Sequence, residues 1–467
     1  MTTSQYGVIS LSGLMRDSAS APGSFVQDPC QRVEWCNLRE GSVLYSRGDE
    51  LRGRSVLIIV QSQLATVAAL MELDGIARRV ILCPPDLSLE HLPHVIDTAQ
   101  VDGIVTDQVL TQLGSPRSLL FSALSRSILP REQSERAEQE TEWILMTSGT
   151  TGLPKLVAHT LASLTAAIHP RGAINAQVVW STFYDIRRYG GLQILLRAAR
   201  TGASLVLPDA AESTADFLAR AASCGVTHIS GTPSHWRRAL MSPAAHLLKP
   251  KYVRLSGEAI DQVILNNLRS AYPEARIVHA FASTEAGVAF EVTDGAPGFP
   301  EDILEADSGV DMSVQDGTLR IRSAGVASRY LGDAAPVLKD QDGFVDTNDL
   351  LELRDGRYYF TGRRDGVINV GGLKVHPEQV EAVISRHPDV RMCVVRSQKN
   401  RITGALVVAD VVLRKDCTPI EHDEALIQSD IMQLCREQLP AHKVPATINI
   451  VPMLGLGGAG KVLRRNA

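Results

Sequence analysis

Apolar runs of strand length alternate with helical periodicity over the first hundred residues. Residues 55–60 (SVLIIV) are rich in β-branched side chains, and residues 63–73 carry apolar side chains at helical spacing. The same order returns with a strand-like run at 79–83, a helix-like run at 89–99 and a third strand at 102–106. This β-α-β-α-β alternation predicts a parallel sheet covered by helices.

The alternation resumes beyond residue 200 and then gives way to a different pattern. Residues 204–207, 213–223 and 227–230 again predict strand, helix and strand. The polar stretch between 109 and 142 has little periodicity and is interpreted as a linker. After about residue 290, short runs separated by Gly and Asp pairs predict antiparallel β structure.

The last hundred residues predict a small separate α+β unit. The expected elements are strands near 367–370, 390–396 and 404–412 and helices at 377–386 and 422–438. We therefore expect two domains, residues 1–364 and residues 365–467.

The composition is that of an ordinary soluble globular protein. Of the 467 residues, 44% are hydrophobic and 21% charged, and the net charge of −5 provides no basic field for nucleic acid. The seven cysteines show no C-x-x-C spacing, which favours reduced thiols in a cytoplasmic protein. The N-terminus lacks the pattern of a secretory signal, and no apolar stretch of about 18 residues predicts a membrane span.

The most informative motif is TSGTTGLPK at residues 147–155. Glycines let the backbone approach anionic oxygens, hydroxyls add donors, and Lys155 adds a positive charge. The apolar run at 142–146 predicts a strand that ends where the glycines begin, which is the context that a phosphate-binding loop requires. The Walker P-loop pattern is excluded because Lys155 is followed by leucine and Pro154 would break the expected helix. A surface turn without a ligand is the remaining alternative.

This loop and further motifs in the same order resemble the adenylate-forming superfamily, which includes acyl- and aryl-CoA synthetases, peptide-synthetase adenylation domains and luciferases. The matching segments are SGEA at 256–259, FASTE at 281–285, DTND at 346–349, GRRD at 362–365, NVGG at 369–372 and GKVLR at 460–464. The resemblance covers nearly the whole chain. It implies an α/β protein in which a large N-terminal adenylation domain of parallel α/β sheets, with a small β-barrel-like part, precedes a small mobile α+β lid.

The resemblance also implies an ATP site and its residues. Thr284 and Glu285 match positions that contact the phosphates and hold Mg²⁺, for which a carboxylate is a preferred ligand. Taken alone, Glu285 could be an acid in the first turn of a helix, and Asp349 could be a turn residue. The remaining nucleotide-binding residues are expected to be Thr147, Ser148, Gly149, Thr150, Thr151, Gly152 and Lys155 at the phosphates, Gly257, Glu258, Ala259 and Phe281 at the adenine, and Asp349 and Arg363 at the ribose.

A moving lid is implied as well. Lys461, next to a Gly-rich stretch, is expected to reach the carboxylate and the α-phosphate while the adenylate forms. Asp365 matches the hinge, whose rotation would remove Lys461 and present Gly371 and Gly372 to a pantetheine arm. Without the resemblance, Lys461 could be a surface lysine near a frayed terminus.

The stretch that should recognise the substrate departs from the family. Most CoA ligases of this family carry an aromatic-His pair before a Gly-Leu run, but residues 183–192 read FYDIRRYGGL and contain no histidine. Alignment on the glycines puts Arg188 at the histidine position, whereas alignment on the aromatic residue puts Asp185 there. Arg188 could bind a second carboxylate or a phenolate, Asp185 could bind an α-amino group, or the two could pair with each other. By resemblance, Gly231 and Thr232 line the acyl pocket.

The sequence therefore predicts an ATP- and Mg²⁺-dependent acid–thiol ligase that works through an acyl-adenylate. The expected acceptor is CoA or the phosphopantetheine of a carrier protein. A stand-alone adenylation enzyme that loads a carrier protein and a non-catalytic nucleotide-binding relative are the alternatives. The acid itself is left open.

Overall fold

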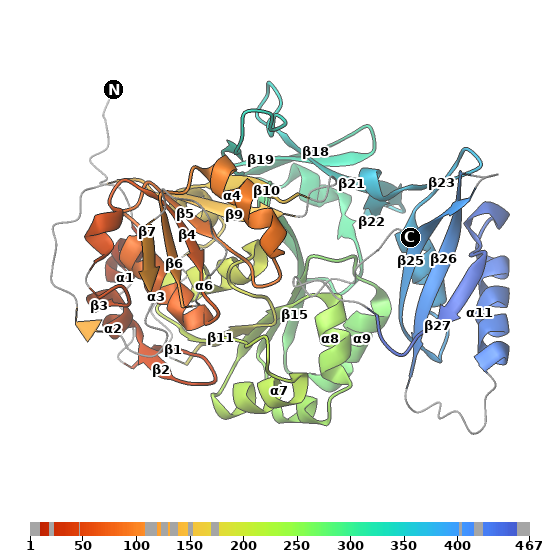
Figure 1. Cartoon of the computed structure of the whole chain (residues 1–467). Helices are drawn as coiled ribbons and strands as arrows, with labels where there is room; N and C mark the ends of the chain where they lie inside the picture. Colours follow the sequence, from red (N-terminus) through yellow and green to blue (C-terminus); the bar gives the residue numbers. More distant parts are fainter. Residues whose placement is uncertain are drawn as a thin grey trace.

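The computed structural model contains a large N-terminal part and a small C-terminal part, which is drawn in blue (Figure 1). Only the backbone is described for residues 119–122 and 129–130. With these, the structure describes residues 10–17, 23–45, 47–107, 119–122, 129–130, 139–147, 153–169, 177–400, 404–414 and 424–454.

The first sheet has seven strands and contains the predicted β-α-β-α-β unit. Its order is β20 (Arg329–Tyr330), β10 (Lys155–His159), β9 (Glu142–Thr147), β5 (Arg79–Leu82), β4 (Ser55–Ile59), β6 (Gly103–Thr106) and β7 (Leu119–Ser122). The strands from β9 to β7 run parallel, whereas β10 is antiparallel to both of its neighbours. The predicted parallel sheet is thus confirmed, and an antiparallel edge that was not predicted extends it.

The second sheet has eight strands and continues the same architecture. Its order is β16 (Gly287–Val292), β15 (Arg276–Ser283), β14 (Tyr252–Ser256), β13 (His228–Gly231), β11 (Val179–Thr182), β12 (Ser204–Val206), β1 (Phe25–Gln27) and β2 (Arg32–Glu34). The strands from β15 to β1 are parallel, and both edges are antiparallel.

Two helices form a buried layer between the sheets. All eleven residues of α3 (Gln63–Leu73) are buried, and α6 (Tyr189–Thr201) is buried along most of its length. Their apolar side chains belong to one core that includes Val56 and Ile58 of the first sheet and Trp180 of the second. A helix that is apolar on every side needs cover on every side, and the two sheets provide it.

The outer faces of both sheets carry the remaining long helices of the large part. Leu57 and Ile81 point away from the central layer and pack with α4 (Leu92–Ala99). On the second sheet, Ile229 and Val253 pack with α7 (Thr214–Ser223), α8 (Pro233–Leu240) and α9 (Gln262–Ala271). Alternate side chains of each strand therefore serve two different cores, as strand geometry requires. The shorter elements are α1 (Leu11–Asp17), α2 (Trp35–Glu40), α5 (Leu161–Thr165), β3 (Gly41–Ser42) and β8 (Leu129–Pro130).

The predicted antiparallel part is a sheet of five strands. In order, they are β17 (Phe299–Pro300), β22 (Arg357–Arg363), β21 (Val345–Arg354), β19 (Thr318–Ser323) and β18 (Val310–Gln315). Every neighbouring pair is antiparallel. The DTND segment lies on β21. The GRRD segment begins at the end of β22, from which the chain continues into the small part.

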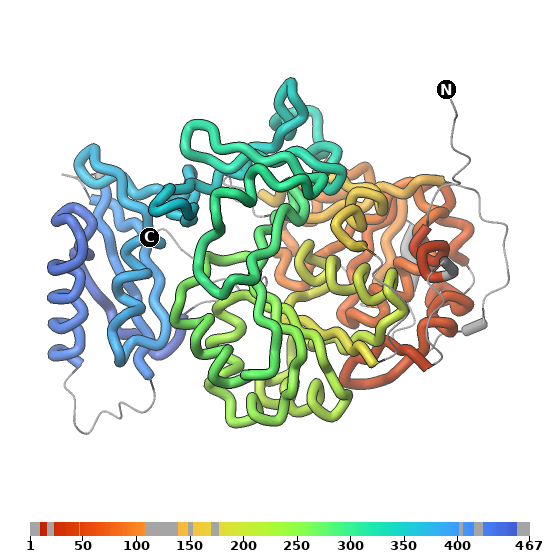
Figure 2. The backbone as a smooth tube through the Cα atoms, turned by 180° about the vertical axis from the view of Figure 1, so that it is seen from behind, coloured from red at the N-terminus to blue at the C-terminus, as the bar shows by residue number. Residues whose placement is uncertain are grey.

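The small part has its own apolar core and stands beside the segment that holds α8 and α9 (Figures 1 and 2). The chain enters it through a hairpin in which Gly371 and Gly372, at φ +57° and +86°, form the two-residue turn. Its elements are β23 (Ile368–Val370), β24 (Leu373–Val375), α10 (Pro377–Ile384), β25 (Val390–Asn400), β26 (Gly404–Leu413), α11 (Glu424–Gln438) and β27 (Thr447–Ile450). None of the described helices, in either part, has the length and apolar character needed to cross a bilayer.

Candidate active site

A cleft of about 2430 Å³ separates the large part from the small part. Its walls come from the segments after β5, β9, β11, β14 and β15, from β21 and β22, and from α10 and β25 of the small part. In open α/β sheets, ligands bind beside the carboxyl ends of the parallel strands, and these segments follow such ends. The structure brings together the following predicted site residues: Thr147, Lys155, Arg188, Gly257, Glu258, Ala259, Phe281, Thr284, Glu285, Asp349, Arg363 and Asp365.

Glu285 lies at the centre of one polar group in this cleft. The hydroxyls of Thr147 and Tyr330 both donate to its Oε1, each over 3.3 Å. Lys155 lies close by, with its Nζ 5.4 Å from the centre of the Tyr330 ring. Burial and the neighbouring Glu285 raise the pKa of the Tyr330 hydroxyl, so it remains a hydrogen-bond donor. Tyr330 was missed by sequence reasoning, because only the pairing of β20 with β10 places it here.

The Glu285 carboxylate fits a role as one ligand of Mg²⁺. Its two hydrogen bonds are long, and no residue of the described ranges forms an ion pair with it. Within those ranges there is also no group of three or more His, Cys, Asp or Glu side chains that could hold a metal ion without a ligand. One carboxylate that shares the ion with phosphate oxygens and water is the arrangement that Mg²⁺ commonly takes at nucleotides.

His159 supports this group from behind. Its Nε2 lies 2.7 Å from the Thr284 carbonyl oxygen and its Nδ1 lies 2.9 Å from the Ser163 hydroxyl. The carbonyl can only accept, so Nε2 carries the proton, and Nδ1 accepts from Ser163. The side chain is fully buried, and burial lowers the pKa of His159 to about 4. A neutral imidazole therefore fixes the backbone just before Glu285.

A second charged group lies at the junction of the two parts. Asp349 on β21 and Arg363 on β22 are paired across the strands, and Arg363 Nε lies 3.2 Å from Asp365 Oδ1. Burial opposes the charged form of Arg363, but Asp349, Asp365 and Glu285 outweigh it and raise its pKa. Arg363 thus interacts electrostatically with Asp349, the predicted ribose ligand, with Asp365, the predicted hinge residue, and with Glu285 of the first polar group.

Two residues predicted to contact adenine are also engaged within the protein. Glu258 accepts a hydrogen bond over 2.9 Å from the backbone N–H of Ser234, in the first turn of α8. Phe281 is stacked on Phe360, with ring centres 5.2 Å apart and planes 7° from parallel. The Glu258 carboxylate therefore anchors the 256–259 turn, and part of the Phe281 ring faces protein.

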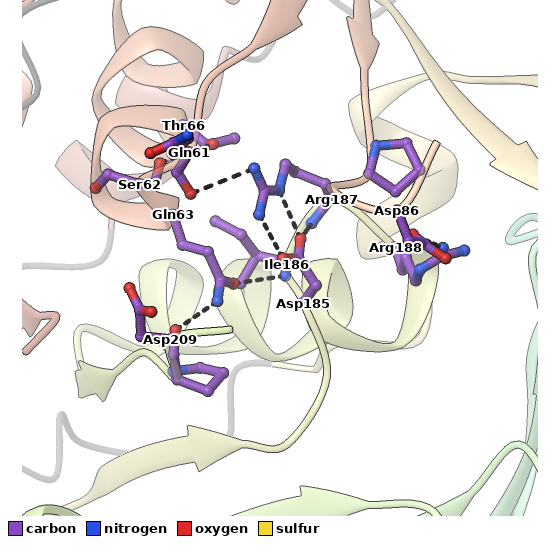
Figure 3. Close-up of polar contacts among 12 residues, drawn as sticks. Gln61, Ser62, Gln63, Thr66, Asp86, Asp185, Ile186, Arg187, Arg188 and Asp209 are labelled. Carbon is purple, nitrogen blue, oxygen red and sulfur yellow. Dashed lines mark hydrogen bonds and ion pairs between the residues drawn. The ribbon is translucent and has the colours of Figure 1, made fainter. Parts of the chain in front are cut away.

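The structure distinguishes between the alternatives for the substrate stretch (Figure 3). Asp185 does not face the cleft, because both of its oxygens bind Arg187, at 2.7 and 2.5 Å. Arg188 does line the cleft and pairs with Asp86. The expectation that Asp185 and Arg188 pair with each other is therefore wrong, and so is a cleft-lining position for Asp185.

Gly231 and Thr232 lie beneath the pocket wall, in contrast to the expectation. The Thr232 hydroxyl caps α8 by accepting from the His235 N–H over 3.0 Å. A Cβ on Gly231 would lie 2.7 Å from the Phe183 ring, so this glycine is needed for packing. The turn glycines Gly371 and Gly372 also lie away from the cleft lining and are exposed. Other predicted residues fall outside the described ranges: Ser148, Gly149, Thr150, Thr151, Gly152 and Lys461.

Comparison with models of known protein families identifies the family of this chain. The model of the AMP-binding enzymes matches residues 41–331, and the model of the AMP-binding enzyme C-terminal domain matches residues 379–461. The chain belongs to the AMP-binding enzymes. Both halves of the family are present in one chain and in the expected order, which confirms the predicted superfamily.

Characterised relatives of this AMP-binding enzyme share about a quarter of its residues. Novobiocin biosynthesis protein H from Streptomyces niveus is 28% identical over 83% of the chain, which spans 66% of that relative's length. A 2-succinylbenzoate–CoA ligase from Bacillus cereus (strain Q1) is 25% identical, with 89% of the chain and 88% of the relative covered.

Solved structures confirm the predicted fold class. An anthranilate CoA ligase in complex with anthranoyl-AMP superposes with a TM-score of 0.82 at 18% identity, covering 99% of this chain and 97% of the other. A benzoate CoA ligase from Burkholderia xenovorans LB400 gives a TM-score of 0.81 at 18% identity, covering 97% and 98%. At this identity, the likeness establishes the fold of the AMP-binding enzyme.

The buried neutral His159 makes a prediction about acid stability. Its pKa is about 4 in the fold and about 6.5 when unfolded, so the unfolded chain binds the additional proton between these values. Stability should therefore be complete above pH 6.5 and fall by about 3 kcal/mol from this residue as the pH drops to 4. The His159→Gln variant should lack this contribution in urea unfolding measured across the range, with His246→Gln at an exposed histidine as the control. Equal pH dependence in His159→Gln and the parent would contradict the assignment.

Proposed function

We propose that this AMP-binding enzyme activates an aromatic carboxylic acid with ATP and transfers the acyl group to the thiol of CoA. The enzyme class, an AMP-forming acid–thiol ligase, is that of relatives named CoA ligases. The observation that carries the proposal is the convergence of Glu285, Asp349, Arg363 and Lys155 in one cleft between the two parts.

The first half-reaction needs positive charge and fixed positions more than acid–base catalysis. A carboxylate oxygen of the acid attacks the α-phosphorus of ATP, the bond to the β-phosphate oxygen breaks, and pyrophosphate leaves. Because anion attacks anion, Lys155 and Arg363 would stabilise the charge that develops, and Glu285 would hold Mg²⁺ at the phosphates. The Asp349 carboxylate would accept from the ribose hydroxyls, and Phe281 would offer its remaining surface to the adenine.

The acid would lie in the cleft at the mouth of a recess between Tyr184 and Tyr189, whose volume of about 20 Å³ has room for about one water molecule. Apolar side chains, including Ile194 and Val288, line its walls. A flat ring would suit this position, because the Tyr184 and Tyr189 rings at the mouth of the recess can pack against another ring. The 2-succinylbenzoate ligases among the relatives act on an acid of this kind, which supports an aromatic substrate.

The second half-reaction would use a different position of the lid. The CoA thiolate attacks the acyl carbonyl, the bond to the AMP phosphate oxygen breaks, and AMP leaves. Rotation of residues 365–467 about Asp365 against residues 1–364 would withdraw Lys461 and bring Gly371 and Gly372 to the pantetheine arm. The exposed position of this glycine turn supports such a role, since no described residue beyond the chain neighbours lies within 4 Å of a Cβ built on either glycine.

A carrier protein is the second candidate for the acceptor. Its phosphopantetheine presents the same thiol, so the adenylation cleft is equally compatible with it. We propose CoA because relatives that match 89% of the chain are named CoA ligases. A cytoplasmic location accords with the scattered cysteines, and all six in the described ranges are free thiols.

Carboxylate-dependent exchange of labelled pyrophosphate into ATP tests the proposed activity. Exchange should require an acid, with kcat/KM for benzoate, anthranilate or 2-succinylbenzoate at least about tenfold above hexanoate, because a ring packs better against Tyr184 and Tyr189 in the cleft. Thioester formation should then proceed with free CoA. A marked preference for holo carrier protein over CoA would assign the carrier protein as the acceptor. Absence of exchange with every acid would refute the activity.

Asp349 should contribute strongly to nucleotide binding. A hydrogen bond to a charged group is worth about 1.5–3 kcal/mol, so Asp349→Asn should weaken ATP binding about 10- to 100-fold in isothermal titration calorimetry. Asp342→Asn, at an exposed aspartate of the same antiparallel region, is the matched control. Unchanged affinity in Asp349→Asn would place the ribose elsewhere.

Lys461 should act in only one half-reaction. Lys461→Ala should reduce pyrophosphate exchange by about 100-fold or more, while thioester formation from a preformed acyl-adenylate stays within about twofold of the parent. Lys399→Ala, at an exposed lysine of the small part, controls for general loss of charge. Equal loss in both half-reactions would contradict the moving lid.

A further inference from the structure

The loop between β11 and α6 is fixed by side chains that the proposed chemistry does not use (Figure 3). This loop belongs to the second sheet, yet its partners follow β4 and β5 of the first sheet. The contacts therefore join the carboxyl ends of the two sheets beside the cleft.

Arg187 makes the main connection. Its Nε and Nη2 bind the two oxygens of Asp185 at 2.7 and 2.5 Å, and its Nη1 donates to the carbonyl of Val60, just after β4. The Asp185 carboxylate also accepts from the Arg187 backbone N–H at 2.8 Å. The two side chains are only 3% and 9% exposed, so the pair is shielded from water. A bidentate pair of this kind restricts both partners to one geometry.

Two further contacts hold the backbone of the same loop. Gln63, in the first turn of α3, accepts from the Ile186 N–H at 2.8 Å and donates to the Pro208 carbonyl at 2.5 Å. Gly191 allows the first turn of α6 to approach the Asp185 carbonyl so closely that any Cβ would collide with it. The backbone on both sides of Arg187 is thus constrained.

The contacts that hold Arg187 and its neighbouring backbone determine the direction in which the Arg188 side chain points. Figure 3 shows Arg187 directed towards Gln61, whereas Arg188 lies beside Asp86 on the other side of the loop. The Arg188 N–H bonds to the Asp185 carbonyl at 3.1 Å, which fixes the start of α6. Asp86 engages Nη2 of Arg188, and Nε has no hydrogen-bond partner among the described residues. That Nε is itself buried, but the Arg188 side chain is 21% exposed and lines the cleft, in a position set by its neighbour.

We infer that Arg187, through its ion pair with Asp185, is a positioning residue that holds Arg188 against the acid substrate. The inference rests on the proposed function and extends it, because it assigns the acid-facing donor to Arg188 and its support to the buried pair. The substrate feature recognised is a hydrogen-bond acceptor on the aromatic acid, for which a guanidinium at fixed orientation is well suited.

Removal of one charge alone would leave the other buried without a partner, so the test replaces both. The variant is Asp185→Asn/Arg187→Met, and the matched control is Glu212→Gln/Arg220→Met. That control removes another buried bidentate pair, with side chains 10% and 15% exposed and bonds of 2.7 and 2.6 Å, which lies outside the cleft lining. Thermal unfolding of both variants reports any general loss of stability.

The informative readout is the KM for the acid in pyrophosphate exchange, compared with the KM for ATP. The Asp185/Arg187 variant should raise the acid KM about tenfold and change the ATP KM less than about twofold, because only the acid-facing donor is misplaced. Arg188→Ala should raise the acid KM about tenfold in the parent but less than about twofold in this variant, since the two changes remove one function.

Each outcome separates the inference from the proposed function. Equal acid KM values in the two double variants, or an Arg188→Ala effect that is the same in both backgrounds, would overturn the inference while exchange by the parent upholds the function. Failure of the parent to exchange with any acid would refute the function and the inference together. A variant that unfolds at a much lower temperature than the control and shows equal rises in both KM values would assign the pair to stability and overturn the inference.

Discussion

The enclosure of α3 and α6 between two sheets is the constraint on which the rest of this structure depends. All of α3 and most of α6 are buried, so neither sheet alone could cover them. Because α3 follows β4 and α6 follows β11, enclosing both helices also brings the carboxyl ends of the two sheets together. The hydrogen bond from Arg187 to the Val60 carbonyl and the contact of Thr147 with Glu285 are made at this shared edge. The cleft is therefore a consequence of how the central layer is buried.

Charges at this edge are arranged in two distinct ways. Some are fully compensated within the protein, such as the buried Asp185–Arg187 pair, and these fix backbone geometry. Others remain available to a ligand, such as Glu285, which has only long hydrogen bonds from Thr147 and Tyr330. The attraction within a compensated pair offsets the cost of burying its charges and fixes its geometry, whereas an available carboxylate provides the interaction that a cation or a bound nucleotide completes.

Local patterns in the sequence predicted a large share of the fold and of the site. Strand-length apolar runs and helical periodicity located β4 to β6 and α3, because burial of one or both faces gives the sequence a periodic pattern. In the small part they located β23, α10, β25, β26 and α11, but not β24 or β27. The motif residues Thr284, Glu285, Asp349 and Arg363 were placed correctly in the cleft by resemblance. Errors arose at Asp185, Gly231 and Thr232, since adjacency to a glycine run does not reveal which way a side chain points. Tyr330 and Asp86 gave no local signal, because their partners are far away in the chain, and the position of Arg187 depends on the distant Val60 carbonyl as well as on the nearby Asp185.

The sequence by itself was enough to indicate the family, because the motifs that resemble the adenylate-forming superfamily are local and stand in the same order, and the family models agree. It also determined the order of the elements, which follows from hydrophobic periodicity. Only the tertiary structure decided between Asp185 and Arg188, since that choice depends on Val60 and Asp86 from two other loops. Which charge is buried and which faces the cleft is settled by contacts between distant segments, and no pattern of neighbouring residues encodes it.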